Sequence, residues 1–300
     1  MKTNSTPVHL AMGIDIGGSH ITVGLVDLSM KKIVRESVER KKVNRHGTAE
    51  EILGVWATTI NTMQDRYPQS FTQVGFAMPG PFDYPNGICL IKGFDKYEAL
   101  YGMNIKEELA ARTNIAAENI MFRNDADAFL DGEIFCGAAQ GYNRVVGLTL
   151  GTGLGSCVYI DGEITDAGLN VLPYKNGIAE DCISSRWFEK RYLEYSGEKI
   201  NGVKKIAEIY PEDPHAKLIF DEFTANLSAV LAHSIRTFQP SAIVLGGNIS
   251  NAFDLFIDGV KKQLSLMVNP PEILRAILNE DAALIGSACW FQSLAIHREK

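Results

Sequence analysis

Two glycine-rich turns carry the residues of this chain that are best suited to chemistry. The turn residues are Gly17, Gly18 and Ser19 in the segment DIGGS, and Gly151, Thr152 and Gly153 in the segment GTGLG. Glycine lets backbone N–H groups approach a ligand directly, and concave arrays of N–H groups bind anions, phosphates above all. The hydroxyls of Ser19 and Thr152 add donors, so the two turns together predict a polyphosphate ligand.

Asp15 ends the predicted strand before the first turn. A carboxylate beside a phosphate is repulsive unless a cation lies between them, so Asp15 predicts Mg²⁺, held directly or through water. Two β-hairpins with ordinary glycine turns are the alternative. A dinucleotide-binding fingerprint is disfavoured because GTGLG leads into the apolar run SCVYI instead of a helix. No Gly-Lys-Ser/Thr follows either turn, so a Walker A loop is absent from the sequence.

Three further segments could contribute to a site. In IVLGGNIS, Gly246, Gly247 and Asn248 follow a buried-type strand, which fits either the close approach of a nucleoside or a plain strand-to-helix turn. In RNDAD, Asp125 follows Asn124 at a predicted strand end. A carboxylate placed there could be a general base or a helix N-cap. The rigid turn PGP, with Gly80 at its centre, could form the wall of a pocket or be a simple loop.

Composition describes an ordinary globular protein and excludes several classes. The 300 residues carry a formal net charge of −7, which argues against a nucleic-acid partner held by phosphate contacts. No apolar stretch is long enough to cross a membrane, and no apolar run near the N-terminus predicts a signal peptide. Five scattered cysteines without a CxxC pair indicate reduced thiols. We therefore expect a cytoplasmic location and neither a membrane nor a nucleic-acid partner.

Strands alternate with helices along the chain, and mixed hairpins accompany them, which predicts an α/β fold. Each half opens with a glycine-interrupted hairpin, so an internal duplication of the scheme is expected. We place the boundary near Arg123, with domains at 1–123 and 124–300. The expected strands include 32–41 and 273–278, and the expected helices of the second half lie near 180–195, 203–210, 215–238 and 250–267, with a closing helix at about 282–297.

The ordered motifs DIGGS, MPGPFD, NDADAFLDGE, LTLGTGLG, VLGGNIS and AALIGSA resemble the ROK sugar kinases of the actin-like ATPase and hexokinase superfamily. The resemblance runs from about residue 12 to 296 and implies two ribonuclease-H-like domains around a central cleft, with the closing helix packed on the N-terminal domain. It implies an ATP-dependent kinase that transfers the γ-phosphate to a hexose or amino sugar, with glucose O6 as the leading acceptor. Asp125 would be the base, and Asn124 and Gly80 would contact the sugar. We also expect a homodimer.

The chain departs from this family between Asp166 and Phe188. Many ROK proteins carry a Gly-Glu-x-Gly-His segment and a CxCGxxGC zinc cluster, whereas this segment has no histidine and only Cys182. We therefore expect no structural zinc, and apolar packing must hold the segment. Glu180 matches the glutamate that contacts the sugar in the family, with an exposed helix-start carboxylate as the alternative. Asp95 falls where the family has a sugar-binding loop, and the match there is loose.

Two other classes of function fit the resemblance less well. A ROK-type regulator carries a helix-turn-helix before the first glycine turn, and the short segment before Asp15 is not expected to supply one. A non-catalytic sugar-binding relic would have no use for Asp15, Asp125 and both glycine turns together. Polyphosphate in place of ATP stays open as the phosphate donor.

Overall fold

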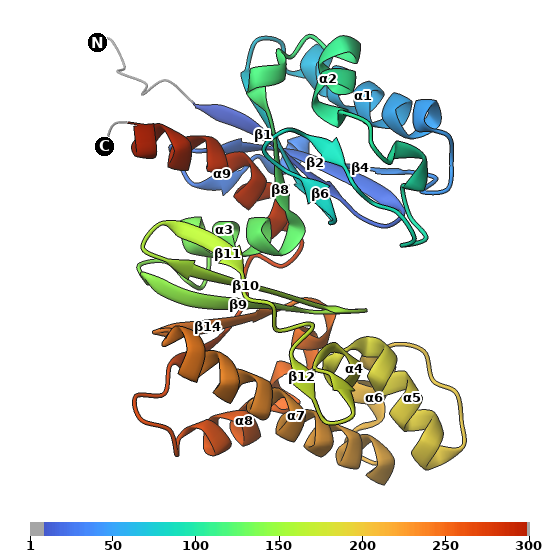
Figure 1. Cartoon of the computed structure of the whole chain (residues 1–300), viewed down its shortest axis with the longest axis vertical. Coiled ribbons are helices and arrows are strands. Elements are labelled where there is room, and N and C mark those ends of the chain that lie inside the picture. The colour runs from blue at the N-terminus through green and yellow to red at the C-terminus, as the bar shows by residue number, and fades with distance from the viewer. Residues whose placement is uncertain (1–8, 299–300) are drawn as a thin grey trace. The chain divides into compact units, whose positions relative to one another are not determined.

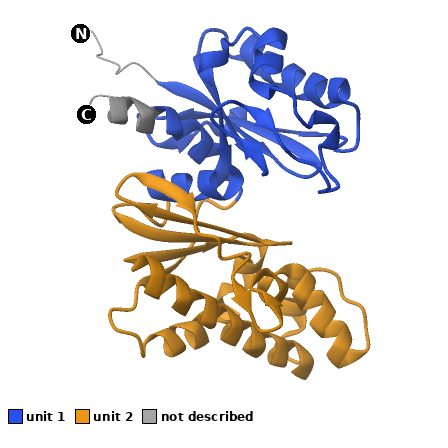
Figure 2. Cartoon of the chain, viewed as in Figure 1, with its two compact units in different colours: residues 1–136, 280–300 blue, residues 137–279 orange. Residues whose placement is uncertain are grey.

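The computed structural model describes residues 9–298 and divides the chain into two compact units (Figure 2). Unit 1 comprises residues 1–136 and 280–300, and unit 2 comprises residues 137–279. Each unit has its own β-sheet and its own hydrophobic core. The division follows Cys136 instead of Arg123, because β8 pairs with β5 inside unit 1 and α3 packs against α9.

The sheet of unit 1 has the strand order β3-β2-β1-β5-β8, with β4 also paired to β2. Its strands are β1 (Leu10–Ile16), β2 (His20–Asp27), β3 (Lys32–Ile33), β4 (Glu39–Lys42), β5 (Phe71–Met78) and β8 (Ile120–Asn124), and a separate hairpin consists of β6 (Phe82–Asp83) and β7 (Ile88–Cys89). Its helices are α1 (Ala49–Arg66), α2 (Ile105–Arg112), α3 (Asp125–Cys136) and α9 (Asp281–Arg298), with short 3-10 turns at Arg35–Ser37, Glu98–Leu100 and Ala117–Asn119.

Local sequence signals explain how unit 1 is layered. Thr48 and Glu51 form a capping box that starts α1, and α1 and α2 cover one face of the sheet in Figure 1. Successive residues of a strand face opposite sides of the sheet. Gly13 and Gly75 therefore face one side, and Met12 and Ile14 face the other. A Cβ on Gly13 would lie 1.9 Å from the carbonyl oxygen of Leu284 in α9. Glycine at this position is therefore what lets α9 pack directly on β1.

Unit 2 repeats this plan with the strand order β11-β10-β9-β14-β15. Its strands are β9 (Arg144–Leu150), β10 (Leu154–Ile160), β11 (Glu163–Asp166), β14 (Ala242–Gly246) and β15 (Glu272–Arg275), and a separate hairpin consists of β12 (Pro173–Tyr174) and β13 (Gly177–Ile178). Its helices are α4 (Glu180–Ile183), α5 (Ser185–Ser196), α6 (Val203–Ile209), α7 (Pro214–Phe238) and α8 (Ile257–Leu264), with a 3-10 segment at Asn248–Leu255.

The two sheets have the same topology. In each, the first strand pairs antiparallel with the second and parallel with a strand later in the chain, as β1 does with β2 and β5, and as β9 does with β10 and β14. The edge strands β8 and β15 extend the parallel part. Two units with one strand order are what a duplicated α/β scheme produces, and the expected α/β class is confirmed.

Several expected elements are interrupted. The strand expected at 32–41 is two short strands separated by a 3-10 turn at Arg35–Ser37, and the helix expected at 180–195 breaks at Ser184, whose backbone is extended. The helix expected at 250–267 is a 3-10 segment followed by α8. Periodicity did not reveal these breaks because apolar residues keep their spacing across them. Over residues 9–298, every helix is too short or too polar to cross a bilayer.

Candidate active site

In unit 1, Asp15 lies in a row of paired residues that crosses three strands. It pairs with Thr22 of β2, which in turn pairs with Arg40 of β4. Asp15 points to the face of the sheet on which α9 packs, because it is two residues from Gly13. The pKa of its carboxyl is raised from 3.8 to about 6, chiefly by burial and next by the negative charge of Asp125, while Arg40 opposes the shift. Asp15 and Asp125 therefore act on each other electrostatically.

A divalent cation would relieve this repulsion. Within residues 9–298, no group of three or more His, Cys, Asp or Glu side chains is gathered to hold a metal ion. Mg²⁺ usually keeps several waters and is bound through one or two carboxylates together with substrate phosphates. One buried carboxylate close to a second, at the edge of a glycine turn, fits that mode of binding. It does not fit a cage made of protein ligands alone.

The glycine turn after Asp15 is fixed from a distant loop. The Gly17 N–H donates to the carbonyl of His20, which closes the turn. Tyr97, which is fully buried, donates a 2.5 Å hydrogen bond from its hydroxyl to the Gly17 carbonyl. Arg45 approaches from the other side: its guanidinium lies 3.5 Å from the position a Cβ on Gly18 would take. The turn thus exposes Gly18 and Ser19 beside a positive charge.

Asn124 and Asp125 mark the junction between β8 and α3. Asn124 is the last strand residue, and its side-chain oxygen accepts a 3.0 Å hydrogen bond from the Ala126 N–H. Asp125 is the first helical residue, and its carboxylate accepts from the same N–H at 2.9 Å. Asn124 therefore shares the capping of α3. Asn124 and Asp125 thus both accept from the same N–H at the start of α3.

The PGP turn belongs to the same neighbourhood. The side-chain N–H of Asn124 donates to the Tyr84 hydroxyl at 3.0 Å, and that hydroxyl donates to the Met78 carbonyl at 3.1 Å. A Cβ on Gly80 would lie 3.2 Å from the Tyr84 oxygen and 3.9 Å from the amide nitrogen of Asn124. The Gly80–Pro81 peptide is cis. Gly80, Tyr84 and Asn124 are thus neighbours in unit 1, and contact of Gly80 and Asn124 with a sugar stays a prediction.

Asp95 lies in the loop that ends at Tyr97, and its side chain is 83% exposed. It is 3.6 Å from the Arg45 guanidinium and 3.8 Å from His46. The loop is tied to the glycine turn through Tyr97, so Asp95 lies on the same side of unit 1 as Gly18. Its assignment as a sugar ligand stays a prediction.

In unit 2, the second glycine turn joins β9 to β10. The Gly151 N–H donates to the Gly153 carbonyl at 3.0 Å, and the Ser185 N–H donates to the Gly151 carbonyl at 2.7 Å. The Leu154 N–H donates to the carboxylate of Glu180 at 2.9 Å. A Cβ on Gly153 would lie only 2.7 Å from the same carboxylate. Glycine is therefore required at Gly153 for Glu180 to reach the turn.

Glu180 is the first residue of α4, and its other carboxylate oxygen accepts a 2.8 Å hydrogen bond from Arg186 in α5. The Arg186 side chain is 69% exposed, so this ion pair is weak and exchangeable. A polar ligand could displace Arg186 from Glu180 at little cost. Glu180 is thus more than an exposed helix-start carboxylate, because it bridges the glycine turn and α5.

The third glycine segment adjoins the second. Gly246 ends β14 and pairs with Thr149 of β9. Gly247 has φ +82°, and a Cβ there would lie 2.4 Å from the Leu150 carbonyl oxygen. Both the positive φ and the short distance to the Leu150 carbonyl therefore require glycine at position 247. The result is that Gly246, Gly247 and Asn248 lie beside Gly151, Thr152 and Gly153 in unit 2.

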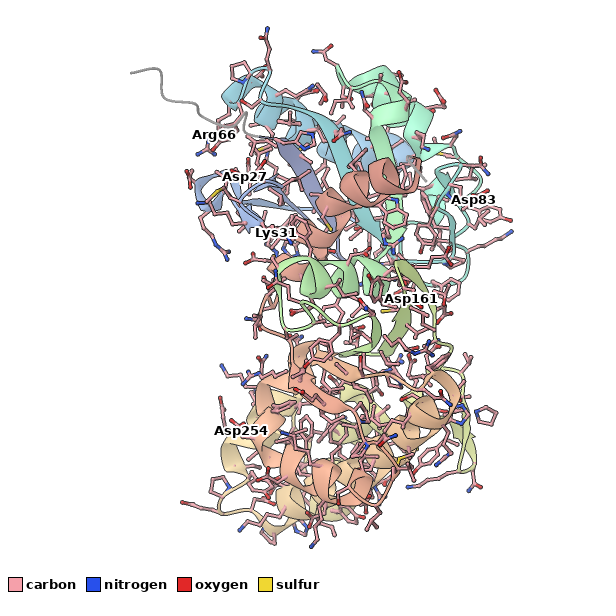
Figure 3. All side chains as sticks on the ribbon, turned by 90° about the vertical axis from the view of Figure 1, so that its left-hand side faces the viewer. Asp27, Lys31, Arg66, Asp83, Asp161 and Asp254 are labelled. Carbon is pink, nitrogen blue, oxygen red and sulfur yellow. The ribbon has the colours of Figure 1, made fainter. Side chains whose placement is uncertain are left out.

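Sequence reasoning missed the side chains that hold these turns. No sequence motif marks Tyr84, Tyr97, Arg40 or Arg186. Each of these residues meets its partner only in the folded chain. Not every acidic residue in a motif contributes to the site. Asp83, labelled in Figure 3, accepts hydrogen bonds from the backbone and side-chain amides of Asn86 and so serves its own hairpin.

A model of the ROK family matches residues 11–170 and 175–294. The chain therefore belongs to the ROK family, and the actin-like ATPase fold expected from the motifs is confirmed. The segment left out, 171–174, falls within the stretch where the sequence departs from the family pattern.

Relatives and solved structures agree with this assignment. The chain is 28% identical to a glucokinase of Thermotoga maritima over 92% of this chain and 95% of that protein. It is 24% identical to an N-acetyl-D-glucosamine kinase of Photobacterium profundum over 92% and 97%. A ROK glucokinase from Streptomyces griseus, solved with glucose and AMPPNP, is similar with a TM-score of 0.74 at 25% identity, over 94% of this chain and 98% of that one.

Proposed function

We propose that the protein is an ATP-dependent sugar kinase that transfers the γ-phosphate of ATP to a hydroxyl of a hexose. The observation that carries the proposal is the electrostatic coupling of Asp15 and Asp125 beside a glycine turn in unit 1. Phosphoryl transfer needs a divalent cation at the phosphates and a base at the acceptor hydroxyl. Two carboxylates in neighbouring but different settings can supply one group to each task.

Asp125 is the proposed base. It would accept the proton of the sugar hydroxyl as that oxygen attacks the γ-phosphorus, while the bond to the β-phosphate oxygen breaks and ADP leaves. Asn124 and Gly80 would contact the sugar, and Glu180 would accept hydrogen bonds from its hydroxyls. Asp95 is retained as a weaker candidate.

Asp15 would hold Mg²⁺ directly or through water, and the cation would neutralise charge on the phosphates. The N–H groups of the first glycine turn would bind phosphate in unit 1. In unit 2, Gly151, Thr152 and Gly153 would do the same, and Gly246, Gly247 and Asn248 would accommodate the nucleoside. Magnesium as the cation, a cytoplasmic location and a homodimer also stay predictions.

The relatives support two candidates for the acceptor sugar. Glucose O6 is the proposed acceptor, supported by the glucokinase relative. N-acetylated amino sugars are the second candidate, supported by the N-acetyl-D-glucosamine kinase relatives. A pocket of ≈ 330 Å³ adjoins Asn124, with Tyr84, Phe122 and Trp290 among its lining residues. Such a space beside a sugar ligand could take an acyl substituent.

The test is ADP release with Mg²⁺ and ATP across glucose, mannose, glucosamine, N-acetylglucosamine and N-acetylmannosamine. The proposal expects saturable turnover with at least one of them and phosphorylation at a single hydroxyl, read by NMR of the product. Inorganic polyphosphate replaces ATP in a parallel arm. Absence of turnover with every sugar and both donors would overturn the proposal.

A further inference from the structure

A single buried amide in unit 2 holds the segment that presents Glu180. Asn226 lies on α7 and is 1% exposed. Its side-chain oxygen accepts hydrogen bonds from the Lys175 ammonium at 2.7 Å and from the Tyr174 hydroxyl at 3.1 Å. Its side-chain N–H donates to the Cys182 carbonyl at 3.1 Å. One side chain thus binds both the tip of the β12–β13 hairpin and the short helix α4.

Only an amide side chain can make all three of these hydrogen bonds. The oxygen meets two donors, and the nitrogen meets an acceptor, so the group must accept and donate at once. An aspartate could keep the bonds to Lys175 and Tyr174 but could not donate to the Cys182 carbonyl. A leucine of similar size could do neither and would leave buried polar groups without partners, which is costly.

The hairpin and α4 are short elements held by apolar contacts as well as by Asn226: Ala179 and Ile183 are fully buried in the core of unit 2. Each strand of the hairpin has two residues, and α4 has four. Apolar packing was expected to fix this segment, and it contributes: Leu169 is buried and Leu172 and Tyr174 pack on the core of unit 2, whereas Val171 is 59% exposed. Backbone bonds from Ala179 to Leu172 and from Glu180 to Asn170 shape the turn itself without anchoring it to a helix.

We propose that Asn226 is a positioning residue for the sugar site: by clamping the β12–β13 hairpin and α4 to α7, it holds Glu180 against the second glycine turn. The path is short and contiguous. Asn226 bonds to Cys182, which lies two residues after Glu180 in the same helix. Glu180 then accepts from the Leu154 N–H at 2.9 Å. The inference rests on the proposed function for its effect on sugar binding.

The same face of α7 makes a second tie, to α5. Glu222 lies one turn before Asn226 and accepts hydrogen bonds from both Arg191 and Tyr195. This contact lowers the pKa of Glu222 despite its burial, with Arg191 as the main cause. It anchors α5, which carries Arg186, whereas Asn226 bonds to α4 and to the hairpin. The two ties are therefore separable by mutation.

Three variants test the clamp. Asn226→Leu removes every bond, and Asn226→Asp removes only the bond to Cys182. Thr224→Val is the matched control, because Thr224 is buried on the same helix and its hydroxyl donates to the Phe220 carbonyl of that helix. Hydrogen exchange read by mass spectrometry follows peptides that cover 151–158, 170–178 and 179–184. Steady-state kinetics give the sugar and ATP KM values.

The clamp predicts faster exchange in all three peptides for Asn226→Leu, including the peptide that contains the Leu154 amide, and unchanged exchange for Thr224→Val. For Asn226→Asp, exchange rises at α4 while the hairpin tip stays protected. The sugar KM rises about fivefold or more in Asn226→Leu, while the ATP KM changes less than about twofold. A general loss of folding in Asn226→Leu would instead change both KM values and speed exchange in peptides throughout the chain.

Two results would overturn the inference: unchanged protection of the Leu154 peptide in Asn226→Leu, or equal changes in both KM values. Failure of the proposed function is a distinct result, because it would show as a wild-type protein that phosphorylates no sugar. In that case the exchange arm still decides whether Asn226 holds Glu180 on the turn.

Discussion

The hydroxyl of Tyr97 donates a 2.5 Å hydrogen bond to the carbonyl of Gly17, a residue 80 positions earlier in the chain. Tyr97 is fully buried, its ring lies edge-on to Trp56, and burial raises the pKa of its hydroxyl above the ordinary value. The hydroxyl is therefore a neutral donor at physiological pH. This bond ties the first glycine turn, which the bond from the Gly17 N–H to the His20 carbonyl closes, to a separate loop.

Tyr97→Phe should therefore loosen the turn without altering the core. We expect the ATP KM to rise about threefold to tenfold and the free energy of unfolding to fall by about 1 kcal/mol, because one buried carbonyl loses its donor. Steady-state kinetics and denaturant unfolding measure the two effects. Tyr101→Phe is the control, since Tyr101 is 51% exposed. An ATP KM equal to that of the wild type would contradict the role of Tyr97.

Asp125→Asn should abolish most turnover while sugar binding persists. The amide keeps the size of the carboxylate, and Asn124 still bonds to the Ala126 N–H, so α3 keeps its start. We expect kcat to fall about 10²-fold or more, because the base is gone. Isothermal titration with sugar checks that binding is retained. Asp127→Asn, two residues further on, is the comparison. Near-normal kcat in Asp125→Asn would remove Asp125 from the mechanism.

Asp15 should make stability depend on pH in the absence of metal. Its pKa is raised from 3.8 to about 6 by burial and by Asp125, so the folded state binds this proton more tightly than the unfolded state. Stability from this group is thus greatest below about pH 4 and falls as pH rises to about 6. Two pKa units correspond to about 3 kcal/mol as an upper bound.

The variant Asp15→Asn lacks the titrating carboxyl and so tests this pH dependence of stability. In metal-free buffer, the variant should melt at a temperature similar to the wild type at about pH 4 and above it at pH 7, while its turnover with Mg²⁺ and ATP is lost. Differential scanning fluorimetry at several pH values follows the difference. A Tm difference that does not change with pH would show that Asp15 carries no buried charge.

Glu180→Gln should weaken sugar binding selectively. Hydrogen bonds to a charged group contribute about 1.5–3 kcal/mol each, so the sugar KM should rise roughly tenfold or more while the ATP KM stays nearly constant. Arg186→Gln is the informative partner, because it removes only the exposed ion pair to Glu180. Its sugar KM should stay the same or fall. A sugar KM unaltered in Glu180→Gln would exclude Glu180 from the site.

A zinc chelator should leave the protein unchanged. The segment 166–188 has Cys182 and no histidine, and Asn226 with its partners is what ties this segment to α7. We expect the same Tm and turnover before and after treatment with a strong zinc chelator, with Mg²⁺ restored for the assay. Elemental analysis provides the direct measurement, and one equivalent of zinc per chain would contradict the expectation.

Local features of the site could be predicted from the sequence because their causes are local. Glycine turns, the carboxylate that precedes one of them, and the capping box of Thr48 and Glu51 each depend on residues a few positions apart. The same holds for Asn124 and Asp125 at the strand-to-helix junction. The order of these motifs along the chain was enough to indicate the family and with it the α/β fold.

The tertiary structure decided which residues are buried and which distant residues are in contact, because no short segment of sequence determines either property. Only the fold places Asp125 where it raises the pKa of Asp15, and only the fold brings Tyr97 to Gly17. Asn226 reads as an ordinary polar residue in a long amphipathic helix until its partners, 44 to 52 positions away, surround it. A hydrogen bond has no sequence signal when its partners meet only after the chain has folded.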